Sequence, residues 1–243
     1  MPPPSTGQTT VSVTTNTEYF LNNLKGYRES VSKIDTYRRI HDFVSKRIAG
    51  VDHLLDIGNG GVFDYDASRV GRITAVDLFL DDLPPELLQV YFPPNAQVRR
   101  GSALALPEPD ATFDTVLMVM LLHHLAGSNW RASWENARLA LAEAWHVVRP
   151  GGRLLIIESC VPEWFFRLEK PAFWLLTRTV GSVLSHPITL QFPAEMIVQE
   201  LRNRSAEIDF ELIPKGRHVL QFGFKVPSFV TPIQIYGIEA RKS

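Results

Sequence analysis

Two short apolar runs that each end in an aspartate constrain the fold of this chain more than any other feature. They cover residues 53–56 and 72–77, and residues 58–61 between them read Gly-Asn-Gly-Gly. Short apolar runs bounded by turn residues are typical of strands buried on both faces, as parallel strands are in a sheet covered by helices. The spacing predicts a strand, a tight turn, a short helix and a second, parallel strand.

The same alternation continues along the chain. Further runs suited to buried strands cover residues 96–99, 112–119 and 153–157. Helical patterns follow over residues 134–148 and 194–203. Two late strand-like segments, 208–213 and 233–240, have no helix evident between them, so they predict an antiparallel hairpin at the sheet edge. The expected fold class is therefore α/β and Rossmann-like, with a mostly parallel sheet and helices on both faces.

The length of the chain, 243 residues, is near the upper end of what one domain holds. Residues 1–17 are rich in Pro, Ser and Thr and are expected to be a flexible tail. Residues 18–50 carry apolar side chains at helical spacing and predict one or two amphipathic helices ahead of the sheet. We expect residues 18–243 to form a single domain, with an insertion at residues 161–190.

Charge and cysteine content exclude several classes of function. A formal net charge of −1 offers no basic field for a nucleic-acid backbone, so no nucleic-acid partner is expected. The one cysteine, Cys160, allows no intrachain disulfide and is too few thiols for a structural zinc site, so no metal is expected and a cytoplasmic location fits. Charged residues interrupt the most apolar stretch, residues 164–180, so no stable membrane insertion is expected.

The glycine turn and the aspartate after the second strand predict a nucleotide-like cofactor. Gly58 and Gly60 allow a tight turn and let a ligand approach bare backbone. Asp77 ends the next strand 21 residues after Asp56, where a carboxylate can accept hydrogen bonds from ribose hydroxyls. The turn lacks the final glycine of the nicotinamide-binding pattern, because this chain continues with Val62 and Phe63 at the end of the turn.

Five segments together resemble a known family. They are Leu55-Asp56-Ile57-Gly58-Asn59-Gly60, Ala75-Val76-Asp77, Gly101-Ser102-Ala103-Leu104-Ala105-Leu106-Pro107 with Phe113-Asp114, Leu122-His123-His124-Leu125, and Val148-Arg149-Pro150-Gly151-Gly152-Arg153-Leu154. In this order they are similar to the class I S-adenosylmethionine-dependent methyltransferases, in the small-molecule branch that includes ubiquinone and menaquinone biosynthesis enzymes. The resemblance implies a seven-stranded sheet with a reversed final hairpin.

The resemblance also implies S-adenosylmethionine as cofactor and places it along the sheet edge. The glycine turn would contact the methionine moiety, Asp77 the ribose, and the stretch after Gly101 the adenine. The cofactor-binding residues that it implies are Asp56, Gly58, Asn59, Gly60, Asp77, Leu78, Ser102, Ala103 and Met120. The chain departs from the family pattern at Val62, where a third glycine is usual, and at Ser102, where an acid is common.

Methyl transfer from a sulfonium needs mainly alignment, with a base where the acceptor loses a proton. His123 and His124 follow the fourth strand at the expected methyl position, and one of them is the expected base. Glu158 ends the fifth strand at the same edge and is expected either to orient the substrate or to act as base. A histidine that only hydrogen-bonds backbone is the alternative for each.

The insertion is dense in aromatic residues. Trp164, Phe165, Trp174 and the loop residue His186 are the expected substrate-binding residues. Their apolar character favours a polyketide, a quinone precursor or a lipid-like acceptor. A helix packed on the core, or one lying on a membrane surface, would show the same composition.

The function expected is methyl transfer to oxygen or carbon of a hydrophobic small molecule in biosynthesis, such as secondary metabolism. The departures at Val62 and Ser102 keep a second interpretation open, in which the fold catalyses a cyclisation, rearrangement or elimination without methyl transfer. A third is a non-catalytic partner subunit. The sequence leaves a homodimer open.

Overall fold

The computed structural model describes residue 26 and residues 34–79, 92–179, 189–204, 207–221 and 224–243. Seven strands form the main sheet, in the order β3-β2-β1-β4-β5-β9-β6. Their bounds are β1 His53–Ile57, β2 Arg72–Asp77, β3 Ala96–Arg100, β4 Phe113–Val119, β5 Val148–Cys160, β6 Glu207–Ile213 and β9 Gln234–Arg241. β9 runs antiparallel to both of its neighbours, while the pairs among β1 to β5 are parallel. The expected fold class and the reversed final strand are confirmed.

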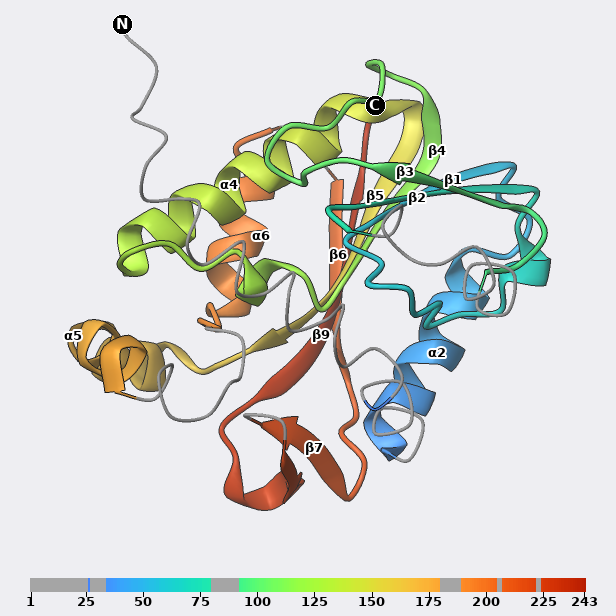
Figure 1. Cartoon of the computed structure of the whole chain (residues 1–243). Helices are drawn as coiled ribbons and strands as arrows, with labels where there is room; N and C mark the ends of the chain where they lie inside the picture. The colour runs from blue at the N-terminus through green and yellow to red at the C-terminus, as the bar shows by residue number, and fades with distance from the viewer. Residues whose placement is uncertain (1–25, 27–33, 80–91, 180–188, 205–206, 222–223) are drawn as a thin grey trace, which may run out of the picture.

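Helices cover both faces of this sheet (Figure 1). Helices α4 (Trp130–Val147) and α6 (Ala194–Arg202) lie on one face, and α2 (Asp35–Arg47) lies on the other. The central strands are buried on both sides for this reason, and Leu54 and Leu55 of β1 are 0 % exposed. This double coverage explains why the central strands are continuous apolar runs rather than alternating ones.

Side-chain caps hold α4 in place at both ends. The Asn129 side chain accepts hydrogen bonds from the backbone N–H groups of Arg131 and Ala132, which satisfies two of the free donors of the first turn. At the other end, Lys242 Nζ donates to the carbonyl oxygens of Trp145 and Val148 at 2.9 and 2.7 Å. A cation at this end also complements the helix dipole.

Helix α2 packs on β9 through a close contact between a ring and a glycine. A Cβ atom built on Gly237 would lie 2.2 Å from Cζ of Phe43, so only glycine leaves room for the ring. The Arg47 guanidinium lies 3.6 Å from the centroid of the same ring. Arg47 also pairs with Glu211 of β6, which ties the helix to the sheet edge.

Two local expectations were wrong, and one further element was not expected. The helix expected between β1 and β2 is only the 3-10 turn η1 (Ala67–Arg69), because Tyr65 is buried against Asp56 and Asp66 caps the turn that follows. Strand β5 begins at Val148, well before residue 153. A separate hairpin of β7 (His218–Gln221) and β8 (Phe224–Pro227) lies between β6 and β9, with the 3-10 turn η4 (Ser228–Val230) after it.

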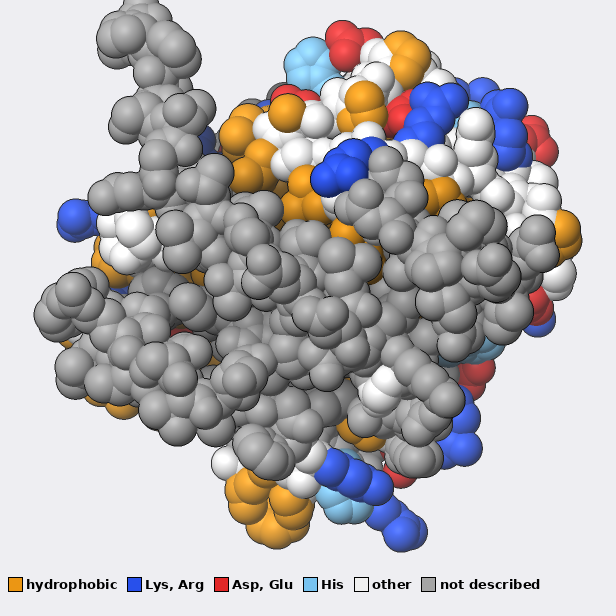
Figure 2. Space-filling model, viewed as in Figure 1, with side chains coloured by type: hydrophobic (Ala, Val, Ile, Leu, Met, Phe, Trp, Pro, Cys, Tyr) orange, Lys and Arg blue, Asp and Glu red, His pale blue; other side chains and the backbone are white. Residues whose placement is uncertain are grey.

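The remaining segments fall partly outside the described residues. Helix α2 lies within the region expected to be helical, whereas the expected tail over 1–17 lies outside. Helix α5 (Glu163–Thr179) occupies the insertion, and residues 180–188 lie outside. No helix in the described part of the chain is long and apolar enough to cross a bilayer. Hydrophobic side chains gather on the surface around the β7–β8 hairpin (Figure 2), where Phe229 of η4 is 87 % exposed.

Candidate functional site

The glycine turn after β1 is built from backbone that favours glycine. Gly58 and Gly60 have φ angles of +69° and +60°, which side-chain-bearing residues rarely adopt. A Cβ atom on Gly58 would lie 2.5 Å from Cδ1 of Leu121, whereas one on Gly60 would meet nothing within 4 Å. The positive φ favours glycine at position 58, where a side chain would also press on Leu121, and Gly60 presents bare backbone beside open space.

A buried carboxylate lies under this turn. Asp56 Oδ2 accepts hydrogen bonds from Asn59 Nδ2 at 2.5 Å and from the Tyr65 hydroxyl at 2.7 Å. Burial raises the pKa of Asp56 to about 6, against the opposing effect of these two hydrogen bonds. Burial also raises the pKa of Tyr65 well above its ordinary value, with the Asp56 charge adding to the effect. The turn therefore rests on a carboxyl group that is costly to ionise.

The aspartate at the end of β2 faces the same turn. Asp77 Oδ2 accepts a hydrogen bond from the Gly60 N–H at 2.9 Å, and Oδ1 accepts one from the Leu78 N–H at 2.6 Å. Burial raises the pKa of Asp77 to about 6 despite these donors. Each carboxylate oxygen can accept two hydrogen bonds, so acceptor capacity remains for a ligand.

One buried atom of the turn has no partner, and it tests whether a cofactor fits. Asn59 Oδ1 is buried and makes no hydrogen bond within the described part of the chain. The Nδ2 group donates to Asp56 and to the Val62 carbonyl, so these contacts fix the orientation of the amide. An unpaired acceptor beside bare glycine backbone suits a ligand that carries hydrogen-bond donors, such as hydroxyl or ammonium groups.

The other residues expected at the cofactor lie along the same edge. Ser102 and Ala103 form a turn just after β3, in which Ser102 Oγ accepts from the Leu104 N–H at 3.1 Å. Met120 follows β4 with a φ of +52°, and its N–H donates to the Ile157 carbonyl at 2.8 Å. Such a φ is strained for a bulky residue and is often found at functional sites.

The two strands that end beside this turn bring His123 and Glu158 together. Glu158 Oε1 lies 2.6 Å from His123 Nδ1 and accepts from the Ser159 N–H at 2.7 Å. Its second oxygen, Oε2, accepts from the Leu122 N–H at 2.7 Å. Both carboxylate oxygens are engaged and the residue is 1 % exposed. In the tautomer with its proton on Nδ1, His123 would donate to this carboxylate and keep Nε2 as its acceptor nitrogen.

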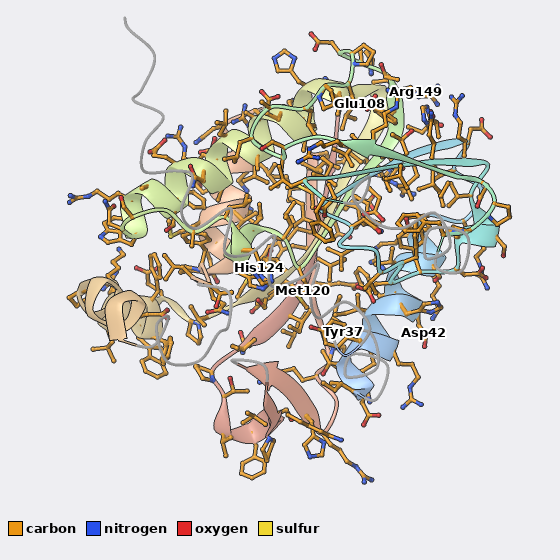
Figure 3. The ribbon with its side chains drawn as sticks, viewed as in Figure 1. Tyr37, Asp42, Glu108, Met120, His124 and Arg149 are labelled. Carbon is orange, nitrogen blue, oxygen red and sulfur yellow. The ribbon has the colours of Figure 1, made fainter. Side chains whose placement is uncertain are left out.

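The adjacent His124 stacks against the first histidine. The two rings have centroids 4.1 Å apart and are tilted by 39°. Both belong to the 3-10 turn η3 (Leu122–His124), and Figure 3 shows His124 and Met120 close together after the end of β4. The side chain of Leu121, which precedes η3, lies against Gly58, so the histidines adjoin the glycine turn.

The expected substrate-binding residues of the insertion differ in where they lie. Phe165 packs against the core, but Trp164 is 61 % exposed and lies on the outer side of α5. The side chain of Trp174 and the whole of His186 lie outside the described residues. Sequence reasoning missed Tyr65 and Ser159. Tyr65 contributes by donating a hydrogen bond to Asp56, and Ser159 by donating one to Glu158, and neither contact follows from a sequence pattern.

A methyltransferase domain model matches residues 55–156, the segment that contains β1 to most of β5. This segment is similar to methyltransferase domains. It holds the glycine turn, Asp77 and both histidines, whereas Glu158 lies just beyond its end. S-adenosylmethionine carries hydroxyl and ammonium donors, which suit the unpaired Asn59 Oδ1 of the turn.

Three known proteins illustrate what this chain is similar to. The chain is 29 % identical to demethylmenaquinone methyltransferase of Symbiobacterium thermophilum over 136 residues, 53 % of this chain and 50 % of that protein. A solved structure of Burkholderia thailandensis 1,6-didemethyltoxoflavin-N1-methyltransferase, with bound 1,6-didemethyltoxoflavin and S-adenosylhomocysteine, has a TM-score of 0.64 at 17 % identity and covers 100 % of this chain and 93 % of its own. The cyclase SpnF has a TM-score of 0.55 at 20 % identity, covering 84 % and 80 %.

The extent of these matches limits what they establish. The chain spans about half the length of the curated relatives it matches. The structural neighbours share the fold, and one fold supports different chemistries, as a cyclase beside methyltransferases illustrates.

Proposed function

We propose that this chain transfers a methyl group from S-adenosylmethionine to an oxygen or carbon atom of a hydrophobic small molecule. The observation that carries the proposal is the hydrogen bond between His123 Nδ1 and Glu158 Oε1, next to the glycine turn. The contact between Leu121 and Gly58 joins the two parts of the site. A proton acceptor and a cofactor turn therefore lie at one edge of the sheet.

The residues of the turn would hold the cofactor, which supplies an activated methyl group on a sulfonium. In this proposal Asp77 accepts hydrogen bonds from the ribose hydroxyls, and Asn59 Oδ1 accepts one from a donor of the methionine moiety. Ser102 and Ala103 border the adenine. The strained backbone of Met120 holds its side chain near the reacting centre.

His123 is the proposed catalytic base. Its Nε2 atom takes the proton from the acceptor hydroxyl or acidic carbon as the methyl group is transferred. Glu158 is a positioning residue, because it is 1 % exposed and both of its oxygens accept hydrogen bonds from the chain itself, so His123 stands between it and the acceptor. It fixes the histidine ring and tautomer and stabilises the imidazolium that forms.

The proposed acceptor is a hydroxylated aromatic molecule such as a hydroquinone. The aromatic residues of the insertion support an apolar ring, and the base needs an acceptor with an ionisable hydroxyl or ring carbon. The name of the relative from Symbiobacterium thermophilum, demethylmenaquinone methyltransferase, points to the same chemical class.

The test measures binding and turnover separately. Calorimetry with S-adenosylmethionine measures cofactor affinity, and anaerobic incubation with 1,4-naphthoquinol, hydroxylated polyketides and unsaturated fatty acids measures release of S-adenosylhomocysteine. We expect cofactor binding and release that depends on a hydroxylated aromatic acceptor. Binding without release across the panel would favour a non-methylating enzyme, and the absence of binding would favour a non-catalytic subunit.

A further inference from the structure

The β7–β8 hairpin and η4 lie beyond the edge of the sheet that carries the candidate site. Strand β9 follows η4 in the chain, and its first residue, Gln234, lies opposite Cys160, two residues after Glu158 in β5. Figure 1 shows the hairpin beyond this end of β9. A partner that contacts the hairpin therefore meets the side of the molecule on which His123 and Glu158 lie.

The 3-10 turn η4 exposes two adjacent apolar side chains. Phe229 is 87 % exposed, more than any other large hydrophobic residue in the described part of the chain, and Val230 is 58 % exposed. Single exposed apolar residues are ordinary on protein surfaces, but apolar side chains gathered at one place with polar residues around them mark an interaction site. We call Phe229 and Val230 the apolar tip.

Hydrogen bonds fix the backbone on both sides of the apolar tip. Lys215 Nζ donates to three carbonyl oxygens at 2.5 to 3.4 Å, those of Ser228, Thr231 and Ile233. Helix α2 supports the hairpin from the other side, because the Thr36 hydroxyl donates to the His218 carbonyl of β7 at 2.9 Å. The exposed ring therefore sits on a backbone that the rest of the fold holds in place.

The segment that contains the apolar tip is basic. Between Glu211 and Glu239 the sequence has no Asp or Glu, although the whole chain has a net charge of −1. The same segment has Lys215, Arg217 and Lys225, and the last two are exposed. Figure 2 shows hydrophobic side chains beside Lys, Arg and His side chains in this region. The surface therefore combines an apolar centre with positive charge around it.

The acids at the base of the hairpin are paired within the chain. Asp35 of α2, which lies against Gly216, pairs with Arg38 at 3.0 Å. Glu211 at the end of β6 pairs with Arg47 at 2.5 Å. These pairs leave the positive charge of the hairpin available to an anionic partner.

We propose that the apolar tip docks on the surface of an anionic phospholipid bilayer, with Arg217 and Lys225 against the lipid phosphates. An aromatic ring flanked by cations suits the boundary between headgroups and acyl chains. The two side chains of the tip offer much less area than the roughly 800 Å² per partner that a stable protein interface buries. This peripheral docking goes beyond the proposed function, and it would turn the edge with the candidate site towards a lipid phase that holds hydrophobic acceptors.

The experiment measures co-sedimentation of the full chain with phosphatidylcholine vesicles, with and without phosphatidylglycerol. We expect the wild type to bind the vesicles that contain phosphatidylglycerol, and high salt to weaken this binding. Phe229→Ala should weaken it about tenfold. Arg217→Gln combined with Lys225→Gln should weaken it about 25-fold, about fivefold for each cation.

Two control variants change the same side-chain types elsewhere on the surface. Leu139→Ala removes an apolar side chain of α4 that is 44 % exposed. Arg131→Gln combined with Arg202→Gln removes two exposed cations from α4 and α6 and changes the net charge equally. Both controls should bind the vesicles like the wild type, and every variant should keep its Tm within about 1 °C, as expected for exposed positions.

Equal binding to both kinds of vesicle, or undiminished binding in Phe229→Ala, overturns the inference. A wild-type dimer that Phe229→Ala converts to a monomer in sedimentation velocity, without vesicle binding, would assign the tip to a second copy of this chain instead. Vesicle binding needs neither cofactor nor acceptor, so it is independent of the methyl-transfer assay. Methyl transfer without vesicle binding leaves the proposed function standing, and vesicle binding without methyl transfer leaves the docking surface standing.

Discussion

The glycine turn and the His123–Glu158 pair lie at the same edge of the sheet but are stabilised in opposite ways. In the turn, burial raises the pKa of both Asp56 and Asp77 to about 6, and Asn59 has an acceptor atom without a partner. In the pair, every oxygen of the buried carboxylate accepts a hydrogen bond. The turn is therefore the incomplete side of the candidate site, with a buried acceptor that no described residue satisfies, and the His123–Glu158 pair is the organised side.

The largest expected effect comes from the organised side. Glu158→Gln places an amide N–H group against His123 Nδ1 or the Leu122 N–H, so the histidine tautomer or the turn is disturbed. We expect kcat to fall by about 10²- to 10⁴-fold, the range for general acid–base catalysis, with S-adenosylmethionine affinity within threefold of wild type. Single-turnover rates with the acceptor found in the panel measure this.

Ser159→Ala is the control for that variant, since it removes a hydroxyl that lies 3.3 Å from both His123 Nδ1 and Glu158 Oε1 but keeps the carboxylate. It should change kcat by less than about threefold, because both contacts of the hydroxyl are long and the short bond between His123 and Glu158 stays. An equal loss in both variants would argue against a special role for the carboxylate.

On the incomplete side, the raised pKa of Asp56 should make the free energy of unfolding depend on pH. A raised pKa means that folded Asp56 holds its proton more tightly than the unfolded chain does, so raising the pH from about 4 to 6 removes stability. Asp56→Asn does not titrate, and its Oδ1 can accept from both Asn59 and Tyr65. Its free energy of unfolding should exceed that of the wild type by roughly 1–3 kcal/mol above pH 6.

Urea denaturation without cofactor at pH 4.5 and 7.5 measures this difference. We expect the advantage of Asp56→Asn to shrink towards pH 4. A difference that does not change with pH would show that the carboxyl is not the source of the instability.

A smaller effect is expected where the turn contacts η3. Gly58→Ala adds a Cβ atom 2.5 Å from Leu121 Cδ1, and we expect S-adenosylmethionine affinity to fall about tenfold, which corresponds to about 1.4 kcal/mol. Gly151→Ala is the control, because Gly151 also has a positive φ, +74°, with nothing within 4 Å of its Cβ position. Calorimetry should find unchanged affinity in that control, and an equal loss in both would attribute the effect to backbone strain alone.

The smallest effect is expected at the exposed tryptophan of the insertion. Trp164 is 61 % exposed, so Trp164→Ala should change KM for the acceptor by less than about twofold and Tm by about 1 °C or less. Phe165→Ala, on the inner side, is the comparison and should raise KM more. A large KM effect at Trp164 would mean that the outer side of α5 takes part in acceptor binding.

The central strands of the main sheet were predictable, because strands buried on both faces have continuous apolar sequences and such runs are visible in the sequence. The β7–β8 hairpin was not predictable, since it lies between two strands that pair with each other. Among the side chains of this hairpin that the structure describes, Val219 is buried and the others are not. The absence of a helix after the glycine turn depends on a tertiary contact between Tyr65 and Asp56, which no local pattern encodes.

The candidate site divides in the same way. Gly58 and Asp77 could be placed from spacing alone, because strand ends of a parallel sheet meet at one edge. The choice between His123 and His124 required the register of β4 and β5, in which Val119 lies opposite Ile157, because this register sets His123 beside Glu158.

The contact between Phe43 and Gly237 has a consequence for the evolution of this chain. Each residue limits the size of the other, although α2 and β9 lie near opposite ends of the sequence. Positions 43 and 237 should therefore covary among relatives, with a larger residue at 237 accompanied by a smaller one at 43. A double substitution such as Gly237→Ala with Phe43→Leu should recover part of the stability that Gly237→Ala alone loses.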